Sequence, residues 1–221
     1  MVAVAQQGSP SLNTHAEYFI GQGITILQEP STILFLPGSR QDLNSQDKTA
    51  FISRDRLFRH LLNTERAIPH LIGFYKDPFR DITPTSARFP DVPFIVKSIT
   101  LVLDVHEDLH GFSATAHGGL ICSIMDEAMG TLLTQNDVLN KEAKAKGYIP
   151  TNSPGFMAAA TASIDVRYLR PLPTPRVVLV TASLARMEGR NMSMRLVVAD
   201  KDGKEYATGN GSFVSFPRAK M

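Results

Sequence analysis

The segment from Gly118 to about Gln135 constrains the fold of this chain more than any other. Its apolar residues recur at the i, i+3, i+4 spacing of a helix, and Leu120 and Leu133 make the other sides apolar too. The repeating set is Ile121, Ile124, Met125, Ala128, Met129 and Leu132. A helix that is apolar nearly all round is buried on most sides. A sheet that curls around the helix would bury it in this way.

The segments around this helix read as strands of one sheet. Phe94 to His106 is β-rich, with Ile99, Leu101, Leu103 and Val105 on one face. The strands predicted after the helix are Met157 to Leu169, Arg176 to Met187, Asn191 to Asp200 and Glu205 to Phe216. Short links, one of which carries Asp202-Gly203, make the last three antiparallel neighbours. One long helix against a single antiparallel sheet predicts an α+β fold.

The part of the chain before this region is expected to be an extension, residues 1–93, packed on a domain of residues 94–221. Up to about residue 50 only Thr32 to Leu36 reads as a strand. Residues 53–66 predict a helix with Ser53 as its N-cap and with Phe58, Leu61 and Leu62 at helical spacing. The five prolines from Pro69 to Pro93 predict a long irregular connection.

Composition narrows the classes of function. Of 221 residues, 43% are hydrophobic and 20% are charged, and the net charge of +2 gives no argument for nucleic acid as a partner. No apolar run approaches the ~20 residues of a membrane span. Cys122 is the single cysteine, so no intrachain disulfide is expected and a reducing compartment is favoured. No secretory signal peptide is visible, and Ala219-Lys220-Met221 resembles a peroxisomal import tripeptide. We therefore expect a cytoplasmic or peroxisomal location.

Asp126 is the strongest candidate for a catalytic residue, because it is a carboxylate in the middle of the apolar helix. A buried carboxylate without a partner costs several kcal/mol or takes up a proton. Two explanations account for a carboxylate at this position. Either a local salt bridge, or a solvated stripe shared with Ser123 and Glu127, offsets the cost of burial, or the carboxylate belongs to a functional site.

The turn His117-Gly118-Gly119 stands directly before the helix. Its glycines allow a ligand to approach closely, and the first N–H groups of a helix are free to hold an oxyanion. His117 either orients a carbonyl group or holds the turn.

The combination of these motifs resembles a known family. Residues His117 to Gly130, HGGLICSIMDEAMG, resemble the signature of the phenylacetate-type branch of the hotdog-fold acyl-CoA thioesterases, in which six residues separate His-Gly-Gly from an Asp on the central helix. Residues Thr161 to Pro171, TASIDVRYLRP, resemble its second strand, and the hairpin at Asp202-Gly203 also fits. The resemblance covers roughly residues 94–217, and some fungal members carry comparable extensions. It implies an antiparallel sheet wrapped around one long central helix.

The resemblance also implies roles for single residues. Asp126 matches the catalytic carboxylate, acting as general base on water or as nucleophile. Gly118 and Gly119 match the turn whose N–H groups hold the thioester oxygen, and His117 matches the residue that orients it. Thr161 matches the Ser or Thr that reaches the site from the neighbouring subunit of a homodimer or homotetramer. No metal and no redox cofactor are implied, and coenzyme A enters only as part of the substrate.

One position departs from the family pattern. The family often has Asn six residues before the His, where this chain has Gly111, so either His110 substitutes for it or this member works differently. Met125 and Met129 are candidates for an acyl pocket, although core packing is the commoner use of such residues. Arg167 and other arginines of the sheet are candidates for binding the phosphates of coenzyme A or an acidic carrier protein. Alternatively, these side chains lie on a solvated face of the sheet.

Three functions are compatible with these residues. The first is hydrolysis of an acyl-CoA or acyl-carrier thioester. The second is dehydration, release or cyclisation of a polyketide-like biosynthetic intermediate, with which Gly111 and the N-terminal extension are compatible. The third is non-catalytic acyl binding, against which Asp126 weighs.

Overall fold

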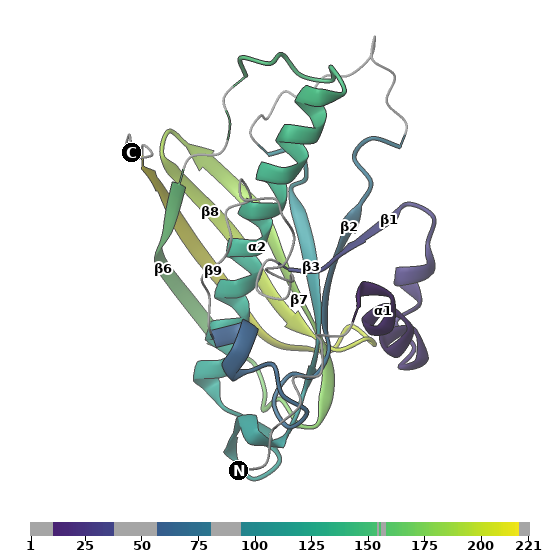
Figure 1. The fold of residues 1–221 in the computed structure, drawn as a ribbon. Helices are drawn as coiled ribbons and strands as arrows, with labels where there is room; N and C mark the ends of the chain where they lie inside the picture. Colours follow the sequence, from purple (N-terminus) through teal and green to yellow (C-terminus); the bar gives the residue numbers. More distant parts are fainter. Residues whose placement is uncertain (1–10, 38–56, 81–93, 154, 156–157, 217–221) are drawn as a thin grey trace, which may run out of the picture.

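The structure, a computed structural model, consists of a seven-stranded antiparallel sheet with a long helix lying across one face (Figure 1). It describes residues 11–37, 57–80, 94–153, 155 and 158–216. The order of strands in the sheet is β1-β2-β3-β7-β8-β9-β6. These strands are β1 Thr32–Phe35, β2 Leu71–Lys76, β3 Ser98–Val105, β6 Ala158–Tyr168, β7 Arg176–Glu188, β8 Asn191–Ala199 and β9 Glu205–Phe216. The other elements are the helices α1 Leu12–Gly21 and α2 Gly118–Ala145, the helical turns η1 Thr25–Gln28, η3 Leu57–Leu61 and η4 Glu107–Leu109, and a small hairpin of β4 His110–Phe112 and β5 Thr115–Ala116.

Helix α2 packs on the sheet through the apolar residues that predicted its burial. Ile124, Met125, Ala128, Met129 and Leu132 have no exposed surface, and they share one core cluster with the predicted inner face of β3. Gly211 of β9 allows the closest approach, because a side chain there would collide with the sulfur of Met129. The hotdog fold, a sheet wrapped around one central helix, is therefore confirmed.

Helix α2 continues for ten residues beyond the predicted end at about Gln135. Its second half keeps a buried face, but two members of that face are the amides Asn136 and Asn140, so the apolar stripe fades in the sequence. Asn136 is fully buried and its amide is satisfied. Its Oδ1 accepts from the N–H groups of Ile95 (2.7 Å) and Val96 (2.9 Å), and its Nδ2 donates to the carbonyls of Val96 and Leu132 (each 2.9 Å). The helix thereby ties down the chain that leads into β3.

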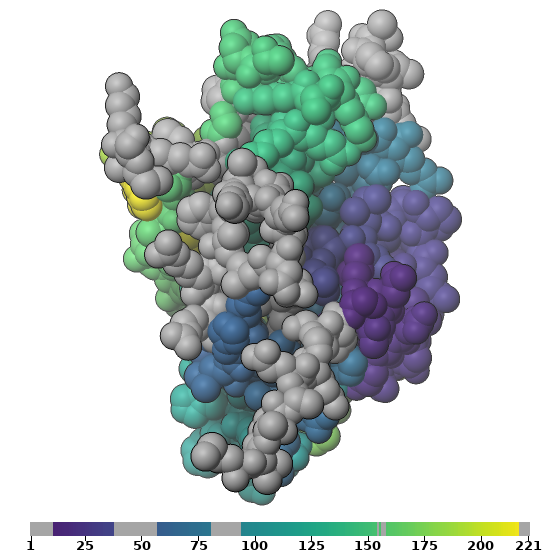
Figure 2. Space-filling view, viewed as in Figure 1, coloured from purple at the N-terminus to yellow at the C-terminus, as the bar shows by residue number. Residues whose placement is uncertain are grey.

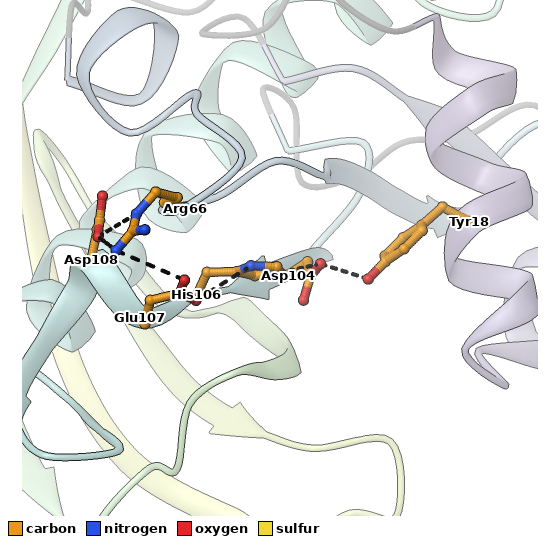
Figure 3. Close-up of polar contacts among 6 residues, drawn as sticks. All are labelled: Tyr18, Arg66, Asp104, His106, Glu107 and Asp108. Atoms are coloured by element: carbon orange, nitrogen blue, oxygen red, sulfur yellow. Dashed lines mark hydrogen bonds and ion pairs between the residues drawn. The ribbon is translucent and has the colours of Figure 1, made fainter.

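Helix α1 covers the opposite face of the sheet and was not predicted. Phe19 of α1 packs in a second core cluster with Ile72, Phe74 and Val102, which alternate with the residues that face α2. A polar chain also anchors α1. The hydroxyl of Tyr18 donates to Asp104 of β3 at 2.6 Å, and His106 contacts the same carboxylate oxygen at 2.8 Å (Figure 3). Burial and the bond to Asp104 raise the pKa of Tyr18 well above its ordinary value. In the space-filling view α1, in purple, forms part of one side of the molecule (Figure 2).

The expectation for the region before residue 94 is wrong in two places. Helix α1 occupies part of the segment thought to lack pattern, and β2 lies within the predicted irregular connection. The prolines that suggested a loop, Pro69 and Pro78, flank β2 instead of interrupting it. Strand β1 confirms the strand at Thr32 to Leu36, and both strands lie in the main sheet. The boundary at residue 94 stays a prediction.

The helix predicted over residues 53–66 is seen only as the turn η3, and Ser53 lies outside the described residues. The C-terminal tripeptide also lies outside them, so the peroxisomal location stays a prediction. Within the described ranges, no helix is long and apolar enough to cross a membrane.

The three strands β7, β8 and β9 are antiparallel neighbours, as their short links predict. Asp200 organises the turn between β8 and β9: its carboxylate accepts from the N–H groups of Asp202 and Lys204 and from the Tyr206 hydroxyl, and it pairs with Arg176 at 3.2 Å. Burial raises the pKa of Asp200, but these donors outweigh burial, so the pKa lies below its ordinary value.

Candidate active site

The turn before α2 supplies one free backbone donor. His117 is the N-cap of α2, and its Nδ1 accepts from the N–H of Gly119 at 2.9 Å. The N–H groups of Leu120 and Ile121 both point to the carbonyl of His117. Among the described residues, the N–H of Gly118 has no acceptor. The predicted oxyanion donor is thus available at Gly118, whereas the N–H of Gly119 is already used by His117.

His117 holds the turn, which is one of the two roles considered for it. Because Nδ1 accepts a hydrogen bond, the proton of the neutral ring is assigned to Nε2. The hydroxyl of Tyr168, at the end of β6, donates to the carbonyl of Gly118 at 2.9 Å and fixes the turn from the other side. The sequence did not single out Tyr168 for this role.

Gly111 packs directly against His117. A Cβ added to Gly111 would lie 2.9 Å from the Cα of His117, closer than real Cβ atoms come. This contact explains physically why an Asn does not fit here. His110 is exposed and does not line the described wall of the cavity next to the turn, and its substitution for that Asn stays a prediction.

The carboxylate of Asp126 lies in a second location, farther along α2. Asp126 is half-buried, and the Thr161 hydroxyl donates to its Oδ1 at 2.7 Å. Among the described residues no cation lies within ion-pair distance of this carboxylate. The resemblance predicted that Thr161 serves the neighbouring subunit, but here it contacts Asp126 of its own chain.

A β-bulge in β6 directs Thr161 toward the helix. Thr161 pairs with Phe213 and Ser163 pairs with Ser212, so Ala162 is an extra residue in β6. Phe213 belongs to the core under α2, and Thr161 opposite it therefore lies on that face. Simple alternation would place Thr161 and Ser163 on one face, but the bulge separates them.

Two cavities follow from this arrangement. The first, which we call the carboxylate cavity, has a volume of about 350 Å³. Its described lining comes from α2 (Ser123, Asp126, Glu127 and Gly130), β6 (residues 159–161), Phe213 of β9, and Leu57 and Phe58 of η3. The second, the turn cavity of about 500 Å³, lies beside His117 and Gly118 and is bordered by Gly111, Phe112 and residues 168–172.

Three predicted substrate-binding residues line neither cavity. Met125 and Met129 are fully buried in the core between α2 and the sheet. Arg167 pairs with Thr208 beyond the bulge and lies on the sheet face away from α2. Sequence reasoning missed Leu57 and Phe58, because nothing in the sequence indicates that a segment so far upstream lines the same cavity as Asp126.

The donor and the carboxylate are well separated within one chain. Gly118 and Asp126 are eight residues apart on α2, which corresponds to about 12 Å along the helix axis. The positive end of a helix acts mainly within its first turn, so it gives little support to Asp126. A single carbonyl group cannot contact both groups of the same chain.

Comparisons with known proteins identify relatives. The model of the thioesterase superfamily matches residues 114–207. Verlamelin biosynthesis protein B of Lecanicillium sp is 34% identical over 183 residues, which cover 76% of this chain and 77% of that protein. Acyl-coenzyme A thioesterase THEM4 of Mus musculus is 27% identical over 100 residues, 45% of this chain but only 35% of that protein. The E. coli PaaI protein from the phenylacetic acid degradation operon aligns with a TM-score of 0.41 and 15% identity, covering 54% of this chain and 72% of that chain.

Proposed function

Because the chain belongs to the thioesterase superfamily, we propose that it hydrolyses the thioester of an acyl-CoA or acyl-carrier substrate. The observation that carries this proposal is the half-buried carboxylate of Asp126, which lines a cavity and is held by the hydroxyl of Thr161 at 2.7 Å.

A thioester is already activated, so its hydrolysis needs chiefly a positioned oxygen nucleophile and a donor to the developing oxyanion. Asp126 supplies the nucleophile, either by removing a proton from water or by attacking the carbonyl carbon itself. In the direct route the C–S bond breaks, the thiolate of the carrier leaves, and water then hydrolyses the acyl-enzyme anhydride. Thr161 fixes one carboxylate oxygen through Oδ1, which leaves Oδ2 for the water or the substrate.

The oxyanion donor, in this proposal, comes from a second copy of the chain. The distance of about 12 Å along α2 prevents Gly118 and Asp126 of one chain from serving one carbonyl. Among the described strands, β6 is an edge strand of eleven residues that pairs on one side only, which suits pairing with another copy. Phe112, Tyr168 and Leu169 are exposed around the turn cavity and favour a covered surface there. We place Asp126 and Thr161 of one subunit opposite Gly118 of the partner subunit.

A thiol-release assay with a panel of acyl-CoA substrates tests the catalytic assignment. Asp126→Ala and Asp126→Asn should each lower turnover at least ~100-fold, as expected for loss of a general base. Asp137→Ala is the matched control, because Asp137 also lies on α2 and its ion pair among the described residues is with Lys141, one turn along the same helix. Unchanged turnover in the Asp126 variants would reject the assignment.

Mixed dimers test the shared site. Gly118→Pro removes the N–H donor at the first position of a helix, where proline is well tolerated. Asp126→Ala and Gly118→Pro should each be inactive alone. When subunits are exchanged in equal amounts, half of the dimers are mixed and each contains one intact site, so activity should return to about a quarter of wild type. No recovery after demonstrated exchange would exclude the two-subunit site.

A biosynthetic role is the second candidate, because a relative of 34% identity is named for verlamelin biosynthesis. Such an enzyme would release, dehydrate or cyclise a carrier-bound intermediate in the same cavity. Mass spectrometry of the product separates the two functions: hydrolysis gives the free acid with one oxygen from water, whereas cyclisation or dehydration does not. Thermal stabilisation by a non-hydrolysable acyl-CoA without any turnover would instead indicate a binding protein.

A further inference from the structure

The carboxylate cavity extends along one face of α2 away from Asp126. Its four helical residues, Ser123, Asp126, Glu127 and Gly130, are spaced i, i+3, i+4 and i+7, so they form one stripe. Thr161 contacts Asp126 and Tyr168 contacts Gly118, which shows that β6 runs antiparallel to α2. The residues before Thr161 therefore lie toward the C-terminal half of α2, on the side of Gly130.

The apolar lining of the cavity comes from β6 on that side, and from the η3 turn and Phe213 of β9. Ala159 and Ala160 of β6 are small, and Leu57 and Phe58 come from the η3 turn, in which the N–H of Leu62 donates to the carbonyl of Leu57 at 2.8 Å. Phe58 is 3% exposed, whereas Leu57 is 39% exposed and borders the opening. The cavity therefore combines polar groups around Asp126 with an apolar lining. This combination matches a substrate with a polar reacting group and an apolar tail.

Gly130 is unexpected in the interior of a helix, where glycine costs roughly 0.5–1 kcal/mol relative to alanine. Its backbone does not require glycine, since it lies within α2 and has no positive φ. Packing does not require it either, because an added Cβ would meet nothing within 4 Å. What a side chain at this position would remove is open volume in the cavity.

We propose that Gly130 and the Leu57–Phe58 turn form an acyl-chain pocket that determines how long an acyl group the enzyme accepts. This inference rests on the proposed function at Asp126. Gly130 lies four residues beyond Asp126, about 6 Å along the axis, which an extended chain spans with roughly four carbon atoms. Butyryl groups end before Gly130, and octanoyl groups pass it.

The test compares kcat/KM for butyryl-CoA and octanoyl-CoA in wild type and variants. Gly130→Leu should lower the octanoyl-to-butyryl ratio at least ~10-fold, and Gly130→Ala should lower it less, because a few methylene groups in a pocket decide selectivity of this size. Both substitutions favour the helix, so the variants should keep or raise the melting temperature. Leu57→Ala should also lower the ratio. Leu61→Ala is its control, since Leu61 lies in the same turn, is 70% exposed and does not line the cavity.

An unchanged ratio in a folded Gly130→Leu variant would overturn the inference while leaving hydrolysis at Asp126 intact. If the proposed function is wrong, the wild type should turn over no thioester at all. In that case the pocket is measured by thermal shift with the thioethers S-butyl-CoA and S-octyl-CoA. Gly130→Leu should then abolish stabilisation by S-octyl-CoA and leave stabilisation by S-butyl-CoA unchanged. Equal stabilisation of wild type and variant, or stabilisation of neither, would reject the pocket.

Discussion

Replacing Asn136 with alanine should remove a large part of the stability of this fold. The side chain is fully buried and makes four hydrogen bonds, two of them from the N–H groups of Ile95 and Val96 to Oδ1. Alanine leaves both N–H groups buried without an acceptor. Each orphaned group costs about 1–3 kcal/mol, so Asn136→Ala should lower the free energy of unfolding by about 2–6 kcal/mol.

Urea unfolding followed by circular dichroism measures this loss, with the slope m checked for constancy. Thr134→Ala is a suitable control because Thr134 is exposed and its hydroxyl donates only to the carbonyl of Thr131 in its own helix. The control should change stability by less than about 0.5 kcal/mol. A loss under about 1 kcal/mol in Asn136→Ala at constant m would refute the reasoning. It would mean that the chain before β3 finds other acceptors or admits water.

Two further predictions concern the carboxylates. Thr161→Ser keeps the hydroxyl and should keep turnover within about three-fold of wild type. Thr161→Val removes the hydrogen bond to Asp126, which is worth roughly 1.5–3 kcal/mol for a charged acceptor, and should lower kcat about ten- to hundred-fold. Equal rates in both variants would show that Thr161 is not part of the site. The lowered pKa of Asp200 means that its contribution to stability is complete above the unfolded-state pKa of about 4 and is lost as pH falls through the lower native value. Acid titration of unfolding should therefore be steeper below about pH 4 in wild type than in Asp200→Asn, and parallel curves would contradict this.

The central part of the fold could be predicted because its periodicities are strong. The i, i+3, i+4 pattern around Ile124 places α2, and alternation in β3 identifies which face meets the helix. Short links with Gly189 and Gly203, both at positive φ, fix the neighbours of β8. Each of these signals is local, so neighbouring residues alone determine the outcome.

The N-terminal elements escaped prediction because their patterns depend on distant partners. Helix α1 buries His15 along with Ala16 and Phe19, so its inner face is not simply apolar. In β2 every residue except Lys76 is buried, since helices and loops cover both sides, and no alternation marks it as a strand. The role of Leu57 at the cavity likewise depends on tertiary packing that no local pattern records.

Some features of the candidate site can be predicted from helical spacing, and others depend on the register of strand pairing. Once residues 118–126 are accepted as helical, their rise of 1.5 Å per residue separates Gly118 from Asp126 by about 12 Å, so one carbonyl cannot reach both groups of a single chain. The proposal of a second copy therefore follows from helical spacing together with the proposed function. The partner of Asp126 does not follow from the sequence, because strict alternation would give Thr161 and Ser163 the same face. Only the pairing of β6 with β9 reveals the extra residue, Ala162, that directs Thr161 to its own Asp126. If this pairing decides the site, deleting Ala162 should leave Thr161 opposite Phe213 and Ser163 opposite Ser212, so that Thr161 still faces Asp126 and turnover is kept; loss of turnover in a folded variant would contradict this account.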